Sequence, residues 1–231
     1  MRVLGDVVAR ERRSDRMALR FADRTTSYRD FCTTAWKSGH ALSHLGVHTG
    51  AQVALTPNPA LPVVTTLFGA ACLGARVTFD ADADARAVLV PAGDEESVAD
   101  RPGRTVVVYG DAPADPSHTH WEGVVWSENP VRPPGDQSPD EVVLESDSAS
   151  LTHRAALTAA ERVVADADLD AEASVALRAS LADPRAVVAG VVAPLVAGGT
   201  VVLGDVTTET TAVVGGGADA TIPISDMSID G

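Results

Sequence analysis

The sequence predicts an α/β fold in which mainly parallel sheets carry helices on both faces. Three observations lead to this expectation. Short, continuously apolar segments such as QVAL at 52–55 and TVVVY at 105–109 have the character of strands buried on both faces. Longer segments with helical spacing of their apolar residues alternate with these strands. Glycines such as Gly46 and Gly74 stand where the helical spacing stops.

The N-terminal part of the chain begins with a predicted helix and a hairpin. Apolar residues at helical spacing predict a short helix over residues 3–13. The stretch MALRFADRTTSYRDF (17–31) is typical of two strands around a short turn. Ser27 is a suitable N-cap for the helix that follows, and Asp30 stands three residues later, close to a capping box. We expect this helix to end at Gly46.

Strands and helices continue to alternate through the rest of the chain. Residues 110–140, rich in Pro, Asp and Ser, are predicted to form a surface excursion with one helical turn at 121–127. No internal repeat stands out, and we expect one domain over residues 1–231. The remaining predicted elements are strands at 52–55, 76–79, 87–90, 105–109, 142–144, 175–179, 200–203 and 212–214, and helices at 59–75, 152–167 and 184–197.

The composition is acidic and poor in lysine. The formal net charge is −14, and Lys37 is the sole lysine. This balance argues against nucleic acid and against anionic membranes as partners, because both attract Lys and Arg. Asp-rich runs on a lysine-poor surface suit a cytoplasm of high salt, where the self-repulsion of the acids is screened. The sequence therefore predicts a halophilic source; a GC-rich genome, which also replaces Lys by Arg, is the alternative.

Cysteines and apolar runs indicate a cytoplasmic, soluble protein. Cys32 and Cys72 lie in apolar surroundings, which predicts buried, reduced thiols. The N-terminal residues 1–16 are charged and lack the apolar core of a secretion signal. The longest apolar run, 186–199, is too short for a bilayer and is interrupted by Pro194 and glycines.

Four stretches, in order, resemble the adenylate-forming superfamily of acyl-CoA synthetases. They are TTSYRDFCTTAWKSGHALSHLGVHTGAQVAL (25–55), NPALPVVTTLFGAACLGARVTF (58–79), LTHRAALTAA (151–160) and VAPLVAGGTVVL (192–203). The resemblance implies the fold of the N-terminal portion of acyl-CoA synthetases, and a truncated member of the superfamily from a halophilic archaeon. It also implies a reaction in which a carboxylate and ATP give an acyl-adenylate and pyrophosphate, followed by a thioester with CoA.

The segment that corresponds to the family's phosphate loop departs from the family's pattern. The family has a Ser/Thr/Gly-rich loop ending in Pro-Lys-Gly, because phosphates need close backbone N–H groups and a compensating cation. Here ESDSASL (145–151) is shorter and has neither glycine nor lysine, and Glu145 and Asp147 add negative charge. We expect at most a degenerate remnant of a phosphate site, formed by Ser146, Ser148, Ser150 and Thr152.

Other parts that the resemblance implies are also missing, so we assign no catalytic residue. The family's His-containing turn before the helix at 184–197 is LADPRAV here. The acyl pocket, the adenine loop, the ribose-binding Asp and the C-terminal domain with its catalytic lysine have no counterpart in this sequence. The glycines of VVGGGADATIPI (213–224) lack a following lysine at phosphate-loop spacing and are read as a turn.

Candidate metal-ligating patterns have structural explanations. His40, His44 and His48 are spaced by four, but Gly46 separates the last from the helix and no acid or cysteine completes a set. The acidic runs at 80–86 and 166–172 lack the glycine and the final acid of a calcium loop. His118 and His120 are read as solvated or core-edge residues, and His153 as part of a helix cap. We predict no metal site.

These observations favour a synthetase-like pseudoenzyme that acts as a binding or partner module, with no cofactor. The expected partner is another synthetase-like chain or a second copy of this one. The alternative is an adenylate-forming ligase that activates a carboxylic acid, completed by a second chain; ATP, Mg²⁺ and CoA are expected as cofactors in that case alone. A third reading is an oligomer-forming structural protein without a ligand.

Overall fold

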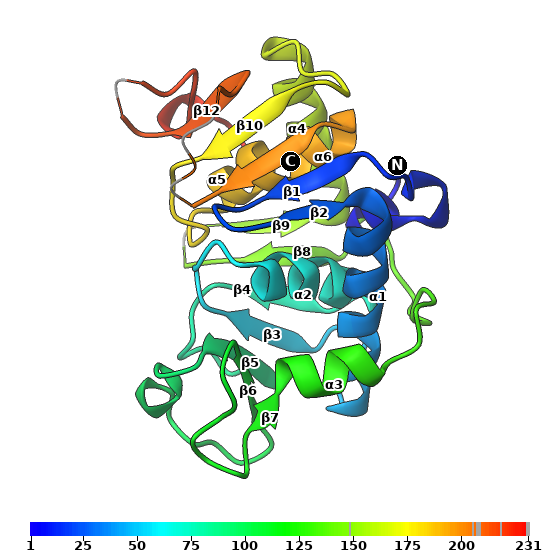
Figure 1. The fold of residues 1–231 in the computed structure, drawn as a ribbon, viewed down its shortest axis with the longest axis vertical. Coiled ribbons are helices and arrows are strands. Elements are labelled where there is room, and N and C mark those ends of the chain that lie inside the picture. The colour runs from blue at the N-terminus through cyan, green and yellow to red at the C-terminus, as the bar shows by residue number, and fades with distance from the viewer. Residues whose placement is uncertain (148, 205, 207–208, 218, 230–231) are drawn as a thin grey trace.

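The computed structural model describes residues 1–147, 149–204, 206, 209–217 and 219–229. Their strands form two sheets that follow each other along the long axis of the molecule (Figure 1). The strands are β1 (Met17–Arg20), β2 (Thr25–Ser27), β3 (Gln52–Leu55), β4 (Arg76–Thr78), β5 (Ala87–Pro91), β6 (Thr105–Tyr109), β7 (Thr119–His120), β8 (Val142–Glu145), β9 (Ser150–Thr152), β10 (Ser174–Leu177), β11 (Thr200–Leu203), β12 (Ala212–Gly215) and β13 (Ile222–Pro223).

Helices connect most of the strands and enclose the main apolar core. The α-helices are α1 (Tyr28–His44), α2 (Leu61–Cys72), α3 (Trp121–Ser127), α4 (His153–Asp166), α5 (Pro184–Val187) and α6 (Ala193–Ala197). The 3₁₀ helices are η1 (Leu4–Val8), η2 (Arg10–Arg12), η3 (Glu95–Ser97) and η5 (Ile224–Asp226), and η4 (Val188–Val192) is a π-helix. Among the described residues, no helix is long and apolar enough to span a membrane.

Both sheets are mainly parallel, which confirms the predicted fold class. Within the described residues, one sheet has the strand order β13-β12-β10-β11-β1-β2 and the other β7-β6-β5-β3-β4-β8-β9. The pairs β1–β2 and β8–β9 are antiparallel hairpins at one edge of each sheet, and the other pairs are parallel. Because strand–helix–strand connections build parallel sheets, this architecture follows from the alternation in the sequence.

The fold contains an internal repeat, contrary to the expectation from the sequence. The first unit runs β1–β2–α1–β3–α2–β4, and the second runs β8–β9–α4–β10–α5–η4–α6–β11. Each central strand, β3 or β10, pairs in parallel with the next two strands along the chain, β4 and β5 or β11 and β12. The hairpins are exchanged: β1 pairs with β11 of the second unit, and β8 pairs with β4 of the first. The two units are therefore interlocked.

Helix α1 begins and ends where the sequence predicts. The Ser27 Oγ accepts the backbone N–H of Asp30 at 3.1 Å, and Gly46 follows the helix with φ +84°. Glycines let α1 approach α2 closely: a Cβ on Gly69 would lie 2.6 Å from the backbone N of Gly39. The thiols of the two free cysteines are buried, as predicted.

The predicted helix over residues 3–13 is wrong. The segment forms η1 and η2 instead, separated at Ala9, whose ψ of 158° is extended. Leu4, Val7 and Val8 are fully buried in η1. A residue and its third neighbour lie on one face of a 3₁₀ helix as well as of an α-helix, so the apolar spacing could not distinguish the two.

The helix predicted over 184–197 is interrupted by a π turn. It is made of α5, η4 and α6 in direct succession. Pro194 stands at the start of α6 and has no N–H to give to the preceding turn. In an α-helix the proline ring would clash with a backbone carbonyl of the preceding turn. A π turn at η4 lets that carbonyl move aside, which explains why the helix is wider there.

Residues 110–140 run over the outside of α1 but contribute to the core. Helix α3, predicted as one helical turn, buries Trp121 and Val125 against the first unit and leaves Trp126 60% exposed. The polar and Pro-rich residues around α3 are largely exposed. Trp121 and Val125 therefore attach to the core a segment whose composition predicts a position on the surface.

Candidate functional site

The β8–β9 hairpin lies where the sequence resemblance places a phosphate loop. Val142 pairs with Thr152, Leu144 with Leu151, and Glu145 with Ser150, with an irregular step after Val142. Helix α4 begins directly after β9. The frame of strand, loop and helix is therefore present, and the loop itself decides what the site can bind.

Residues 146–149 join the two strands, and two of the residues described there, Ser146 and Ala149, are hydrogen-bonded to each other. The Ser146 N–H donates to the Ala149 carbonyl at 2.8 Å, and the Ala149 N–H donates to the Ser146 Oγ at 3.1 Å. These two backbone donors are occupied within the turn. An anion that used these two donors would have to displace those hydrogen bonds, because a phosphate cradle is made of free backbone N–H groups.

The four residues predicted as a phosphate-site remnant have different surroundings. Ser146 is part of the turn, and the Thr152 Oγ1 accepts the N–H of Ala155 at 3.1 Å as the N-cap of α4. Ser150 is exposed on β9, and Ser148 lies outside the described residues. Their assignment to a phosphate site stays a prediction.

The carboxylate of Glu145 is paired and directed back along the sheet. Its Oε2 lies 3.1 Å from Arg76 Nη1 and 3.1 Å from Gln52 Nε2. Arg76 and Gln52 are the first residues of β4 and β3, so the Glu145 side chain reaches away from the turn. Because Arg76 compensates its charge, Asp147 is the acid that remains exposed in the turn itself.

The loop before α5 is also satisfied by its own side chains. The Asp183 Oδ1 accepts the N–H of Arg185 at 2.9 Å, and Asp183 Oδ2 lies 2.8 Å from Arg185 Nη2. The hydrogen bond from the Arg185 side chain lowers the pKa of Asp183. This short-range pair caps α5 at the place where the resembling family has a histidine.

His153 is not the cap of α4, which corrects the expectation from the sequence. Thr152 is the cap, and the His153 ring is fully buried behind it. The His153 Nδ1 accepts the backbone N–H of Leu4 at 3.0 Å. Burial lowers the pKa of His153 to about 4, although the nearby Glu141 and Asp6 carboxylates oppose this shift.

The other histidines make contacts that hold the 110–140 segment. His40 Nε2 lies 3.2 Å from the Val131 carbonyl, and His44 Nδ1 lies 2.8 Å from Glu128 Oε1. His48 is exposed. Among the residues that the structure describes, no group of three or more His, Cys, Asp or Glu side chains is arranged to hold a metal ion.

The sequence did not reveal a His–Glu pair near β7, at the edge of the sheet that contains β3. His118 Nδ1 lies 2.6 Å from the Oε2 of Glu95, a buried carboxylate that also accepts the Ala114 N–H at 2.8 Å. The hydrogen bond from Ala114 lowers the pKa of Glu95. The pair lies beside a groove of about 470 Å³. The residues that line this groove include no Ser, Thr, Cys or Lys that could act as a nucleophile. We therefore assign the His118–Glu95 pair a structural role in holding the loop at Ala114.

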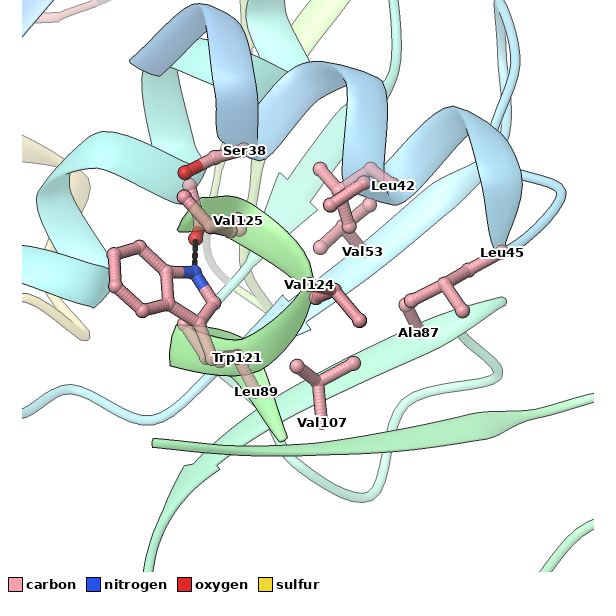
Figure 2. Close-up of a pocket in the computed structure, with 12 residues that line it drawn as sticks. Ser38, Leu42, Leu45, Val53, Ala87, Leu89, Val107, Trp121, Val124 and Val125 are labelled. Atoms are coloured by element: carbon pink, nitrogen blue, oxygen red, sulfur yellow. Dashed lines mark hydrogen bonds between the residues drawn. The ribbon is translucent and has the colours of Figure 1, made fainter. Parts of the chain in front are cut away.

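An apolar cavity under α3 is too small for a substrate. Its volume is about 10 Å³, roughly the space of one water. In Figure 2, Val124 of α3 lies below Leu42 of α1, while Trp121 and Val125 of α3 lie on the side of Ser38. The Trp121 Nε1 donates to Thr66 Oγ1 at 3.1 Å, drawn as the dashed line in Figure 2. The cavity is a packing gap between helices and sheet.

No protein-family model matches the sequence, and no curated protein matches it. Solved structures do match. The anthranilate CoA ligase AuaEII in complex with anthranoyl-AMP gives a TM-score of 0.81 at 19% identity over 92% of this chain and 49% of that one. A benzoate CoA ligase from Burkholderia xenovorans LB400 gives 0.77 at 19% identity, covering 93% and 50%.

A third match identifies the portion of those enzymes that is shared. The N-terminal domain of FACL13 from Mycobacterium tuberculosis gives a TM-score of 0.74 at 19% identity, covering 88% of this chain and 57% of that one. The chain spans about half the length of the CoA ligases it matches. It therefore has the fold of the N-terminal part of adenylate-forming CoA ligases, with two mainly parallel sheets.

Proposed function

We propose that this protein is a non-catalytic relative of the adenylate-forming CoA ligases that acts as a binding or partner module and takes no nucleotide at the β8–β9 hairpin. The observation that carries the proposal is the hydrogen-bonded turn at 146–149. Its backbone donors at Ser146 and Ala149 are bonded within the turn, and the segment 145–151 contains neither glycine nor lysine.

Electrostatics support the same proposal. Adenylation places a triphosphate with several negative charges in the site, and the protein must offset them with a cation or with aligned N–H dipoles. Arg76, which contacts the residue just before the turn, is engaged by that residue's carboxylate, Glu145, at 3.1 Å. Asp147 adds a negative charge in the turn itself. The partner we propose is a second synthetase-like chain or another copy of this protein.

The alternative is a working ligase on carboxylic acids, with ATP, Mg²⁺ and CoA, completed by a second chain. The observation that favours it is the close fold match to a CoA ligase in complex with an acyl-adenylate. In that case a partner would supply the cation and the acyl pocket.

ATP–pyrophosphate exchange separates the two proposals. The protein is assayed with MgATP and a panel of aromatic, aliphatic and dicarboxylic acids in molar KCl, alone and after co-expression with candidate synthetase-like chains. We expect exchange no faster than in protein-free controls. Acid-dependent exchange by the chain alone would overturn the non-catalytic proposal, and exchange with a partner alone would establish the alternative.

A further inference from the structure

One buried titratable group lies outside the proposed binding role. The His153 side chain is fully buried at the start of α4, and it connects segments 149 positions apart through the Leu4 N–H to Nδ1 hydrogen bond of 3.0 Å. Leu4 begins η1, the N-terminal 3₁₀ helix. The ring is thus a polar tie between η1 and the second repeat unit.

The hydrogen bond requires a neutral ring. Nδ1 can accept the Leu4 N–H when the imidazole carries its proton on Nε2, whereas an imidazolium has donors at both nitrogens. Protonation would place the Nδ1–H of the ring opposite the Leu4 N–H, so that two donors would face each other in a buried site. The Nε2 of His153 is itself buried without a protein partner, so a charged ring gains no acceptor there.

Other contacts besides the His153 hydrogen bond also hold η1. A Cβ on Gly5 would lie 2.6 Å from Gln137 Oε1 and 3.1 Å from Arg132 Nη2, so the segment 132–137 packs directly on η1. The Asp6 carboxylate accepts the backbone N–H of Arg2 at 2.9 Å. A second polar tie reaches η1 from α1, since the Trp36 Nε1 donates to the Val8 carbonyl at 2.9 Å.

Two carboxylates act on the ring. Asp6 belongs to η1, Glu141 to the turn before β8, and both favour a protonated ring. Arg132 lies 3.5 Å from Asp6 and pairs with that carboxylate. The thiol of Cys72, at the end of α2, is neutral, since burial raises its pKa to about 12. Desolvation outweighs these charges, and the ring is neutral at pH 7.

We propose that His153 is an acid-sensitive latch for the N-terminal segment: its neutral ring holds Leu4 through Nδ1, and uptake of a proton removes that acceptor and loosens η1 from α4. The event is a protonation without covalent change. It would make the docking of residues 3–8 weaker in acid than at neutral pH.

Native-state hydrogen exchange tests the latch in the whole protein. Opening that exposes His153 restores its ordinary pKa of about 6.5, against about 4 in the closed state. Linkage then predicts that the opening constant of residues 3–8 rises roughly 25-fold between pH 7.5 and pH 5, after correction for intrinsic exchange. Amides in the centre of α1 should change less.

His153→Asn is the informative variant, because its Oδ1 is bonded to Cγ as Nδ1 is, so it can accept the Leu4 N–H but does not titrate. We expect the pH response of residues 3–8 to disappear in this variant and to persist in the control His48→Asn, which replaces an exposed ring. If His153→Asn does not fold, NMR titration of the His153 ring in the unaltered protein decides. A ring that titrates near pH 6.5, or a pH response that survives His153→Asn, would overturn the proposal.

Discussion

The β1–β2 and β8–β9 hairpins, which begin the two repeat units, share the same hydrogen bonds and strand register. In the first, residues 21–24 join β1 to β2, and the Phe21 N–H donates to the Arg24 carbonyl at 2.8 Å. In the second, residues 146–149 join β8 to β9, and the Ser146 N–H donates to the Ala149 carbonyl at the same 2.8 Å. Both registers are irregular at the same step after the first strand residue.

The likeness continues into the helices. Ser27 and Thr152 cap α1 and α4, each accepting an N–H three residues later at 3.1 Å. Beyond the caps, Arg29 and Arg154 pair with acids fourteen residues earlier. The residues described at the ends of the second turn therefore make the same contacts as those of the first, whose position carries no proposed ligand. This comparison teaches that the contacts of Ser146 and Ala149 recur at a hairpin with no proposed ligand.

The units differ in what surrounds a glycine of the helix after the central strand, and this difference gives the largest expected effect. A Cβ at Gly69 would lie 2.6 Å from the Gly39 N and 2.7 Å from the Ala35 carbonyl, which are backbone atoms of α1. At Gly190 the clash is with the end of the Leu177 side chain, which can move. We expect Gly69→Ala to lower the free energy of unfolding by about 3 kcal/mol.

Gly190→Ala is the matched control, since both glycines lie in the helix after the central strand of a unit. The repacking of Leu177 and the better helix propensity of Ala should offset each other to within about 1 kcal/mol. Equilibrium denaturation of the two variants measures the contrast. Equal losses would mean that the two glycines are equally constrained by their surroundings.

Tyr28 and His153 occupy the same place after their caps but respond differently to pH. The Tyr28 hydroxyl donates to the Gly199 carbonyl at 2.8 Å, and burial raises its pKa, so it stays neutral in acid. The pKa of His153 is lowered to about 4, so the unfolded chain binds the proton first as the pH falls. Stability is then full above about pH 6.5 and is lost progressively towards pH 4.

We expect the loss due to His153 to reach about 2 kcal/mol between pH 7.5 and pH 5. Urea denaturation at a series of pH values measures it, and subtraction of the His153→Asn curve removes the contribution of the carboxylates. A difference curve that is flat over this range would show that the ring titrates alike in the folded and unfolded chains.

Removal of the helix caps has the smallest expected effect on stability, and it tests most closely whether α1 and α4 begin in the same way. Ser27→Ala and Thr152→Ala each remove a side-chain acceptor of one N–H. Each should cost about 1 kcal/mol of unfolding free energy. Chemical denaturation of both variants checks this, and a loss confined to one of them would break the correspondence of the two helix starts.

Much of the fold could be predicted because its signals are local. The strands Gln52–Leu55, Thr105–Tyr109 and Thr200–Leu203 have the predicted bounds, since short apolar runs between turn residues are sufficient to define buried strands. Ser27 and Gly46 mark the limits of α1 for similarly local reasons. The failure at residues 3–13 arose where two helix types share the same spacing.

Features that depend on contacts between distant segments could not be predicted. The repeat is carried by backbone register, with little more than Ser-Tyr-Arg at 27–29 and Thr-His-Arg at 152–154 as a trace in the sequence. The pairing of Glu145 with Arg76 and of His153 with Leu4 requires the fold itself. The sequence located the candidate site but not the state of its hydrogen bonds.

The most direct test of the account is a thermal scan of the protein with and without millimolar MgATP in molar KCl. A ligand at 100 times its Kd stabilises a folded protein by about 2.7 kcal/mol, which shifts Tm by several degrees. We predict no shift beyond that caused by MgCl₂ alone, while a full-length CoA ligase in the same assay is stabilised. A saturable rise in Tm with MgATP would contradict the claim that the turn at 146–149 is a structural hairpin without a nucleotide.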